Sequence, residues 1–544
     1  MILLSIFNIF KRRKQRKKQN SQFMQKQSQT NQQNDTSGQA DQLEEKYFKN
    51  KIGENIQIIM KTLGDSSDLI IRKLELPTEQ PIQAAIIMID GLINGRTVNE
   101  NIIHSLISNE KTIREADRNK IFDVIEKKVL SVTAAESVYD WNTFFDSLLS
   151  GETLILIDGY KKVLATKTSG GEKRQITPPE TEVSIRGPRD AFTESLNTNV
   201  ALIRRRIKNP HLWLETLTVG KVNKNKIGIM YINGIANDKI VREVKKRIKR
   251  IDTDSIIESG EIEQFIEERT YTFFPTVFQT ERPDVVAANL LEGRVAVLVS
   301  GSPFALTVPA LFIEFFQAAD DYSTRFDISA AIRILRILIF FISLVAPATY
   351  VAITTFHQEM IPTILIITIA AQREAVPFPA FVEAFIMEIT FEILREAGVR
   401  LPRTIGQAVS MVGALVIGQA AVEAGIVSPA MVIVVAITAI ASFATPSFSV
   451  AISIRLIRFI LMFLAAFIGF YGMISGLMFM TLHLCSLRSY GVPYMSPLAP
   501  AMMKNLGDTL IRMPTWAKNI RPKLISQKNI KRQGNEQPPS PRNN

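Results

Sequence analysis

Hydrophobic positions divide this chain into a patterned first half and a nearly continuous apolar second half. Residues 83–92 form a short apolar run with β-branched side chains and predict a buried strand. Three further segments carry apolar residues at helical spacing, and they are 100–107, 118–129 and 140–151. Gly151 predicts the end of the last helix. Residues 47–150 are therefore expected to form a first, mostly helical α/β subdomain.

Beyond residue 151 the pattern changes to alternating strands and helices. Strand-like runs lie at 152–158, 161–168, 212–220, 226–232, 295–299 and 304–308, and helix-like runs at 192–208, 238–251 and 261–269. The Asp158-Gly159 pair predicts a hairpin turn, and Ser300-Gly301 predicts a second. These elements favour a second α/β subdomain, 151–325, so the soluble domain is expected to have two lobes.

Residues 329–490 are the apolar region of the chain. Uncharged windows there include 337–358 and 404–422, and at 1.5 Å per residue they span about 29–33 Å, enough to cross a bilayer core. The apolar stretch at 360–372 is too short and predicts a re-entrant or broken segment. Spans are expected near 337–356, 377–394, 404–423, 428–445, 457–471 and 474–487. The fold class is therefore α+β and membrane, a two-lobed α/β domain followed by a polytopic helical domain of about five to six spans.

Charge is concentrated at the two ends of the chain. The net charge is +12; the basic run KRRKQRKK at 11–18 and the basic tail 491–544 each carry a net +7, so the remaining chain sums to −2. Because neither belongs to a folded face, a nucleic-acid groove is not indicated. Residues 1–46 are Gln-rich and are expected to form a disordered cytosolic arm, or one that adheres to anionic lipid.

Arginines between the apolar windows orient the expected spans. Arg395, Arg400 and Arg403 are assigned to one loop, and Arg455 and Arg458 to another. Basic loops remain on the cytosolic side of a membrane. Both termini are therefore expected to be cytosolic.

The residues that could support catalysis or bind metal are few and scattered. Cys485 is the single cysteine, and the four histidines lie far apart without a second ligand at metal-binding spacing. The loop SGGEKR (169–174) lacks the spacing of a phosphate-binding loop. We therefore expect no metal, no cofactor and no enzymatic activity.

Three glutamates stand out because they interrupt an apolar helix. Glu383, Glu388 and Glu392 would each be costly in lipid, so they are expected to face protein or water. One interpretation is that they line a cation pathway, and an oligomer would arrange them as rings of carboxylates. In that case Gln substitutions at 388 and 392 should leave the protein level intact and slow cation release. The other interpretation is that Arg373 and Arg395 neutralise them.

Two further groups suggest contacts. Arg204, Arg205 and Arg206 end a predicted helix, where they either complement the helix dipole on a solvated face or contact lipid phosphate or a neighbouring subunit. Small residues recur four apart, which permits close helix packing in lipid. These helix-packing residues are Ala414, Gly418, Ala421 and Gly425.

Several segments together resemble the A-subunit family of GerA-type spore germinant receptors, over residues 65–497. The matching segments are GETLILIDG (151–159), SIRGPRDAFTESLNTNVALIRRRIK (184–208), YING (231–234), TERPD (280–284), LLEGRVAVLVSGSPF (290–304), DDY (320–322), VPFPAFVEAF (376–385), FEILREAGVRLP (391–402) and VGALVIGQAAVEAG (412–425). The basic arm before residue 47 extends beyond the pattern of the family.

The resemblance implies a multi-pass component of a nutrient receptor in the inner membrane of spores. Such A subunits act with a permease-like B subunit and a lipoprotein C subunit, and they are thought to form an oligomeric ion conduit that opens when the B subunit binds nutrient. Two other interpretations are a paralogue associated with dipicolinate release and a stand-alone secondary transporter. Internal repeats would favour the transporter, and the sequence shows none.

Overall fold

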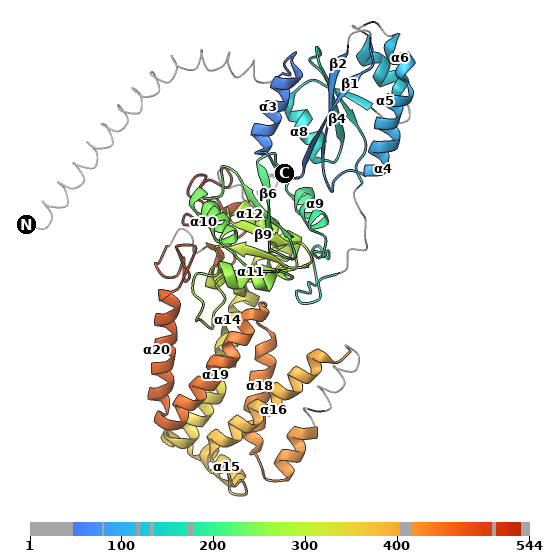
Figure 1. The fold of residues 1–544 in the computed structure, drawn as a ribbon. Coiled ribbons are helices and arrows are strands. Elements are labelled where there is room, and N and C mark those ends of the chain that lie inside the picture. The colour runs from blue at the N-terminus through green and yellow to red at the C-terminus, as the bar shows by residue number, and fades with distance from the viewer. Residues whose placement is uncertain are drawn as a thin grey trace, which may run out of the picture. The chain divides into compact units, whose positions relative to one another are not determined.

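The structure is a computed structural model, and it describes residues 47–78, 81–115, 117, 120–130, 135–170, 178–402, 413, 416–502 and 507–534. The chain forms two compact units. The first comprises residues up to 172 together with 208–210, and the second comprises the remainder, including all the membrane helices. We call the described α/β region of the first unit the first lobe and the α/β region of the second unit the second lobe (Figure 1).

The first lobe contains a five-stranded antiparallel sheet in the order β1-β2-β4-β5-β3. The strands are β1 (Leu69–Leu76), β2 (Ile82–Ile89), β3 (Ala135–Val138), β4 (Thr153–Ile157) and β5 (Val163–Thr166). The predicted hairpin at Asp158-Gly159 joins β4 to β5, and Gly159 has a φ of +90°, which favours glycine. Because β4 pairs with β2, the boundary expected at 150 is wrong, and the first lobe extends through β5.

Helices cover this sheet. They are α3 (Ile52–Leu63), α4 (Gly95–Thr97), η1 (Val98–Ile103), α5 (His104–Ser108), α6 (Glu110–Arg114), α7 (Ile121–Val124), η2 (Ile125–Val129) and α8 (Trp141–Leu149). The predicted helices at 100–107, 118–129 and 140–151 correspond to members of this set. The side chain of Asp140 accepts hydrogen bonds from the backbone N–H of Asn142 and Thr143, both at 3.1 Å, and so begins α8.

The second lobe repeats the plan with a sheet in the order β6-β7-β9-β10-β8. Its strands are β6 (Leu212–Val219), β7 (Asn225–Ile232), β8 (Phe278–Thr280), β9 (Val295–Val299) and β10 (Ala305–Val308). Its helices are α9 (Leu196–Arg206), α10 (Asp238–Lys249), α11 (Ser259–Ile266), α12 (Pro283–Leu291), η3 (Phe312–Phe316) and α13 (Asp320–Ser323). The antiparallel β9–β10 pair confirms the second predicted hairpin.

The apolar region of the chain is helical. Its labelled helices are α14 (Phe326–Thr355), η4 (Gln358–Met360), α15 (Thr363–Arg373), α16 (Ala380–Arg400), α18 (Pro429–Phe443), α19 (Phe448–Ile468) and α20 (Phe470–Ser486), and residues 416–423 are also helical. Among the described residues, α14 and α19 are long and apolar enough to cross a membrane. The 11-residue α15 lies between α14 and α16 and corresponds to the expected short segment.

Two details of the membrane half differ from the expectation. Arg455 and Arg458 lie within α19 and not in a loop, and Arg395 and Arg400 lie within α16. The sequence placed loops at charged residues, but a charge inside an apolar helix is tolerated where a partner meets it. The last apolar window is divided into two helices, as expected, and the division falls at Gly469, whose φ of +64° separates α19 from α20. Arg403 lies outside the described residues.

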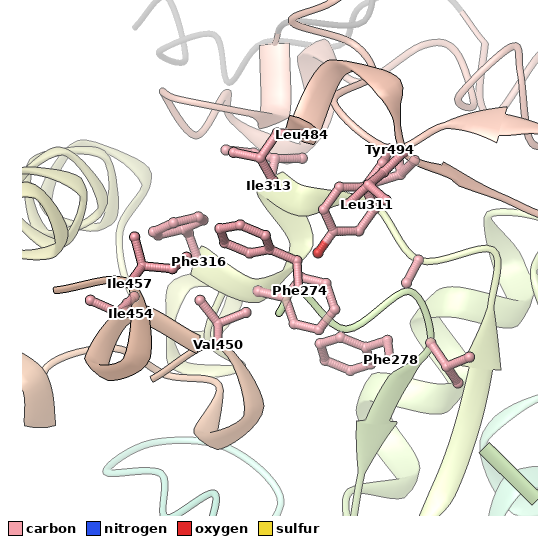
Figure 2. Packing of buried hydrophobic residues seen from close by; sticks show 14 of the residues in the cluster. Phe274, Phe278, Leu311, Ile313, Phe316, Val450, Ile454, Ile457, Leu484 and Tyr494 are labelled. Carbon is pink, nitrogen blue, oxygen red and sulfur yellow. The ribbon is translucent and has the colours of Figure 1, made fainter. Parts of the chain in front are cut away.

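The core of the second lobe continues without a break into the membrane helices. Figure 2 shows this junction, where Phe274 and Phe316 of the second lobe pack beside Val450 and Ile454 of α19. Tyr494, which follows α20, packs in the same cluster. The second lobe is therefore packed directly on the helices beneath it.

The basic C-terminal tail was expected to lie outside any folded face, and for its described residues, up to 534, this is wrong. A short hairpin, β11 (Arg488–Ser489) and β12 (Val492–Pro493), leads into the tail, which contains η6 (Thr515–Ala517). Ile525 is fully buried in the core of the second lobe, and Lys528 pairs with Asp238 at 2.6 Å. Buried apolar residues such as Ile525, which lies between Lys523 and Lys528, hold the tail against the second lobe.

Candidate functional site: charged residues between the membrane helices

The three predicted glutamates of α16, Glu383, Glu388 and Glu392, each meet an arginine from another segment. Glu383 is fully buried, and its Oε1 accepts a hydrogen bond from Arg373 Nε at 3.1 Å. Its second oxygen accepts from the backbone N–H of Ser428 at 2.9 Å. Ser428 caps α18, so Glu383 supplies negative charge at the start of that helix, where the helix dipole favours it. Glu383 therefore ties three segments together.

Glu388 and Glu392 face α19 one turn apart. The carboxylate of Glu388 lies 3.0 Å from Arg458 Nη1, and both side chains are 2% exposed. Glu392 pairs with Arg455, and its side chain is 37% exposed. The two glutamates are four residues apart on α16 and the two arginines are three residues apart on α19, so each pair of residues lies on one helix face. Both ion pairs therefore lie along one helix–helix contact. We call these two pairs the α16–α19 ion pairs.

The contact between α16 and α19 contains more arginines than carboxylates. Arg395 stacks over the ring of Phe443 at 5.0 Å from its centroid, and one of its Nη atoms has no hydrogen-bond partner among the described residues. The Nε atom of Arg458 is likewise without one in the region of the chain that the structure describes. Arg395 was expected to neutralise these glutamates, but Glu388 pairs with Arg458 instead. Arg373, the other expected partner, does pair with Glu383.

A second charged cluster lies where α14 leaves the second lobe. Arg333 is fully buried and donates to Asp321 at 3.1 and 3.2 Å and to the carboxylate of Asp508 at 3.1 Å. Arg336 also donates to both oxygens of Asp321, at 3.1 and 3.2 Å. Asp508 also receives hydrogen bonds from Lys518 and from Tyr322, the latter at 3.0 Å. We call this set the junction network; nothing in the sequence pattern pointed to it because Asp508 is far away along the chain.

The arginines that end α9 separate into three environments. Arg204 is fully buried, which makes it wrong as a subunit or lipid contact. Arg206 pairs with Asp190 and donates to the carbonyl of Leu202 at 3.0 Å. Arg205 is exposed and remains a candidate for such a contact. Arg204 lies on the buried face of α9, whereas Arg205 is exposed. The three consecutive arginines therefore do not form one charged surface.

The stripe of small residues packs within the chain. A Cβ at Gly418 would lie 3.5 Å from Val432 of α18, so this glycine is close to a neighbouring helix of the same chain. Ala421 packs against the main core. Gly425 has a φ of +66° and ends its helix, and Ala414 lies outside the described residues.

These features define a class: a membrane-associated protein in which a two-lobed α/β domain is attached to a set of helices braced by ion pairs. The model of the Bacillus/Clostridium GerA spore germination protein family matches residues 57–524. The chain belongs to this family, as its motifs suggested.

Curated relatives agree with this assignment. Spore germination protein KA of Bacillus subtilis (strain 168) is 56% identical over 490 residues, which are 90% of this chain and 89% of that protein. Spore germination protein B1 of the same organism is 40% identical over 86% of this chain and 96% of that protein. Spore germination protein GerLA of Bacillus cereus is 38% identical over 87% of this chain and 96% of that protein.

The chain is also similar to a solved structure. The crystal structure of the N-terminal domain of the A subunit of the Bacillus megaterium spore germinant receptor GerK3 has 41% sequence identity, covering 49% of this chain and 97% of that chain, with a TM-score of 0.40.

Proposed function

We propose that this chain is the A subunit of a nutrient receptor in the spore inner membrane and that it forms the ion-conducting oligomer of that receptor. The permease-like B subunit would hold the nutrient, and a lipoprotein C subunit would complete the receptor. Relatives named spore germination proteins over nearly the whole chain support the role in germination. The proposed role is conduction and signalling, and it requires no catalysis.

The α16–α19 ion pairs are the observation that carries the conducting role. They place two carboxylates on one helix within an otherwise apolar set of helices. In this arrangement arginines neutralise both carboxylates, so they do not attract a cation. A path lined by Glu388 and Glu392 would form only when α16 separates from α19. We therefore propose that nutrient binding to the partner breaks these pairs, and that Glu383 stays fixed and acts as the pivot.

The burial of Glu388 corrects one expectation. A Gln at position 388 would leave Arg458 buried without a carboxylate, and breaking a buried pair costs about 3–5 kcal/mol. Protein level should therefore fall in that variant. Glu392 is partly exposed, so its replacement is the cleaner test.

The test is nutrient-triggered cation release from spores that carry E392Q at normal abundance. The matched control is E396Q, one turn along the same helix, where an exposed Glu396 pairs with Arg400 at 2.6 Å. E392Q should slow release several-fold, and E396Q should leave it unchanged. Equal release in the two variants would refute a conducting role for Glu392. Normal cation release with slow dipicolinate release would favour the dipicolinate-associated alternative.

A further inference from the structure

One segment of the second lobe exposes apolar side chains and turns polar side chains inward. Along residues 181–186, which we call the strap, the polar side chains of Glu182 and Ser184 turn inward, whereas Val183 is 76% and Ile185 is 89% exposed. The hydroxyl of Ser184 is buried without a hydrogen-bond partner among the described residues. A segment on a water-exposed surface normally turns its polar side chains outward and its large apolar side chains inward. The outer face of the strap therefore suits an apolar environment.

Hydrogen bonds hold the backbone of the strap in place, so the exposure of its apolar side chains follows from a fixed conformation. Glu281 Oε1 accepts from the backbone N–H of Thr181 at 2.6 Å and from that of Glu182 at 2.9 Å. Arg282 donates to the carbonyl of Glu182 at 3.2 Å and to that of Pro188 at 2.9 Å. These contacts fix the backbone while Val183 and Ile185 point away from the lobe.

The strap lies close to the membrane helices. Asp320 accepts from the backbone N–H of Ile185 at 3.4 Å and from that of Arg186 at 3.2 Å, and α14 begins six residues after Asp320. Thr181 lines a groove with Leu394 of α16 and Phe448 of α19. The strap therefore lies at the level where the helices leave the second lobe.

A second exposed loop lies at the same level. Thr272 Oγ1 and His483 Nε2, near the end of α20, are 2.9 Å apart. Ser453 of α19 donates to the carbonyl of Phe273. Tyr271, between these anchored positions and α11, is 94% exposed. Tyrosine is enriched where proteins meet the membrane–water interface.

Basic side chains accompany the apolar ones. Arg186, at the end of the strap, and Arg189, three residues beyond it, are exposed and form no ion pair within the described region of the chain. Arg488, two residues after the end of α20, is exposed as well. Near Tyr271 the balance is different because Glu268 is present, and it accepts from the backbone N–H of Gly491 at 3.1 Å. The positive charge therefore belongs mainly to the strap.

We infer that the strap and Tyr271 form a collar that contacts the lipid surface and that Arg186 and Arg189 bind anionic phospholipid headgroups. This inference rests on the proposed crossing of the membrane by α14 and α19. Apolar side chains at the interface with adjacent arginines are the combination that binds anionic lipid. The collar is also continuous with exposed apolar residues of the helices, such as Phe448 and Leu482, which favours lipid over a protein partner.

Depth can be measured with the full chain in nanodiscs. Because Cys485 is the only cysteine, a C485S background accepts single labels, at I185C and Y271C, and at K239C on α10 as the control. Nitroxides attached to lipid headgroups should quench a fluorophore at 185 and 271 at least twofold, and much less at 239. A label at 460 on α19, within the proposed span, should be quenched by nitroxides deep in the acyl chains. Loss of that signal would refute the span, not the collar.

Charge can be tested in parallel. Raising the fraction of phosphatidylglycerol in phosphatidylcholine nanodiscs should raise the thermal midpoint of the parent protein. The R186E/R189E variant should lose at least half of that rise, whereas K239E/R242E, with the same charge change on α10, should keep it.

Three results would overturn the inference. The first is no quenching at 185 and 271 in nanodiscs that show the acyl-chain signal at 460. The second is cross-linking between copies through I185C in place of quenching, which would assign the strap to an interface between copies of this chain. The third is an equal loss of the lipid effect in both charge variants.

Discussion

The α16–α19 ion pairs and the junction network both bury arginines against carboxylates, but they differ in redundancy. Arg333 contacts two aspartates and further backbone carbonyls, and Asp321 receives two arginines. Arg458 meets one carboxylate and leaves its Nε without a partner among the described residues. A charge with several partners resists displacement, whereas a charge with one partner is freed when that contact breaks. The junction is therefore suited to transmit motion, and the helix contact is suited to change.

The largest effect is expected from breaking the junction network. R333A would leave Asp321 and Asp508 short of their main partner, at a cost of about 3–5 kcal/mol. The thermal midpoint and the abundance of the full chain should both fall sharply. R325A is the control, because Arg325 pairs with Asp327 on the surface, where such pairs contribute little. Similar losses in both variants would remove the special role of the network.

Replacement of the Glu388–Arg458 pair should separate stability from function. E388L alone leaves Arg458 buried and unpaired and should destabilise the chain by about 3 kcal/mol. E388L/R458L should recover most of that loss, because apolar residues often replace a buried pair without cost. Nutrient-triggered release should stay impaired in the double variant. Recovery of release together with stability would show that the pair is only structural.

A partly buried carboxylate that forms no ion pair within the described residues, Glu182, sharpens the comparison. Burial raises the pKa of Glu182 from 4.5 to about 7, with Glu281 adding to the rise and a hydrogen bond from Thr280 opposing it. The folded state thus holds the proton more tightly than the unfolded state, so this contribution to stability is full below about pH 4.5 and is lost as pH rises to about 7. The thermal midpoint should decline over that range and level off above it. E182Q should flatten the decline, whereas E54Q, on the exposed surface of the first lobe, should not.

The smallest effect is expected at Gly418. Its added Cβ would lie 3.5 Å from Val432, an ordinary contact, and alanine favours the helix. G418A should change stability by less than about 1 kcal/mol. G469A is the contrast, since its Cβ would lie 2.7 Å from His357 at a φ of +64°. A strongly destabilised G418A variant would mean that the stripe packs more tightly than described.

Local patterns predicted most of the strands and helices of the two lobes. The hairpins at Gly159 and Gly301 followed from turn residues, which act over a few positions. The boundary between lobes was wrong because β4 belongs to the first sheet through its pairing with β2, a contact between distant segments. Strand pairing of this kind leaves no local signal.

The candidate site was predicted incompletely, for the same reason. The cost of charge in lipid singled out Glu383, Glu388 and Glu392, and it predicted that they face protein or water. It did not identify Arg455 and Arg458 as partners, because these arginines are more than 60 residues away and looked like loop residues. Packing of α16 on α19, which composition does not encode, brings the charges together.

Exchange of the two charges tests the central claim most directly. In E388R/R458E the buried pair is restored, but its carboxylate moves from α16 to α19. At abundance matched to the parent, we predict that nutrient-triggered cation release remains slow, because the ring of carboxylates on α16 has lost a member. Release at the parental rate from the exchanged pair would contradict the account and would leave Glu388 and Arg458 as a structural brace.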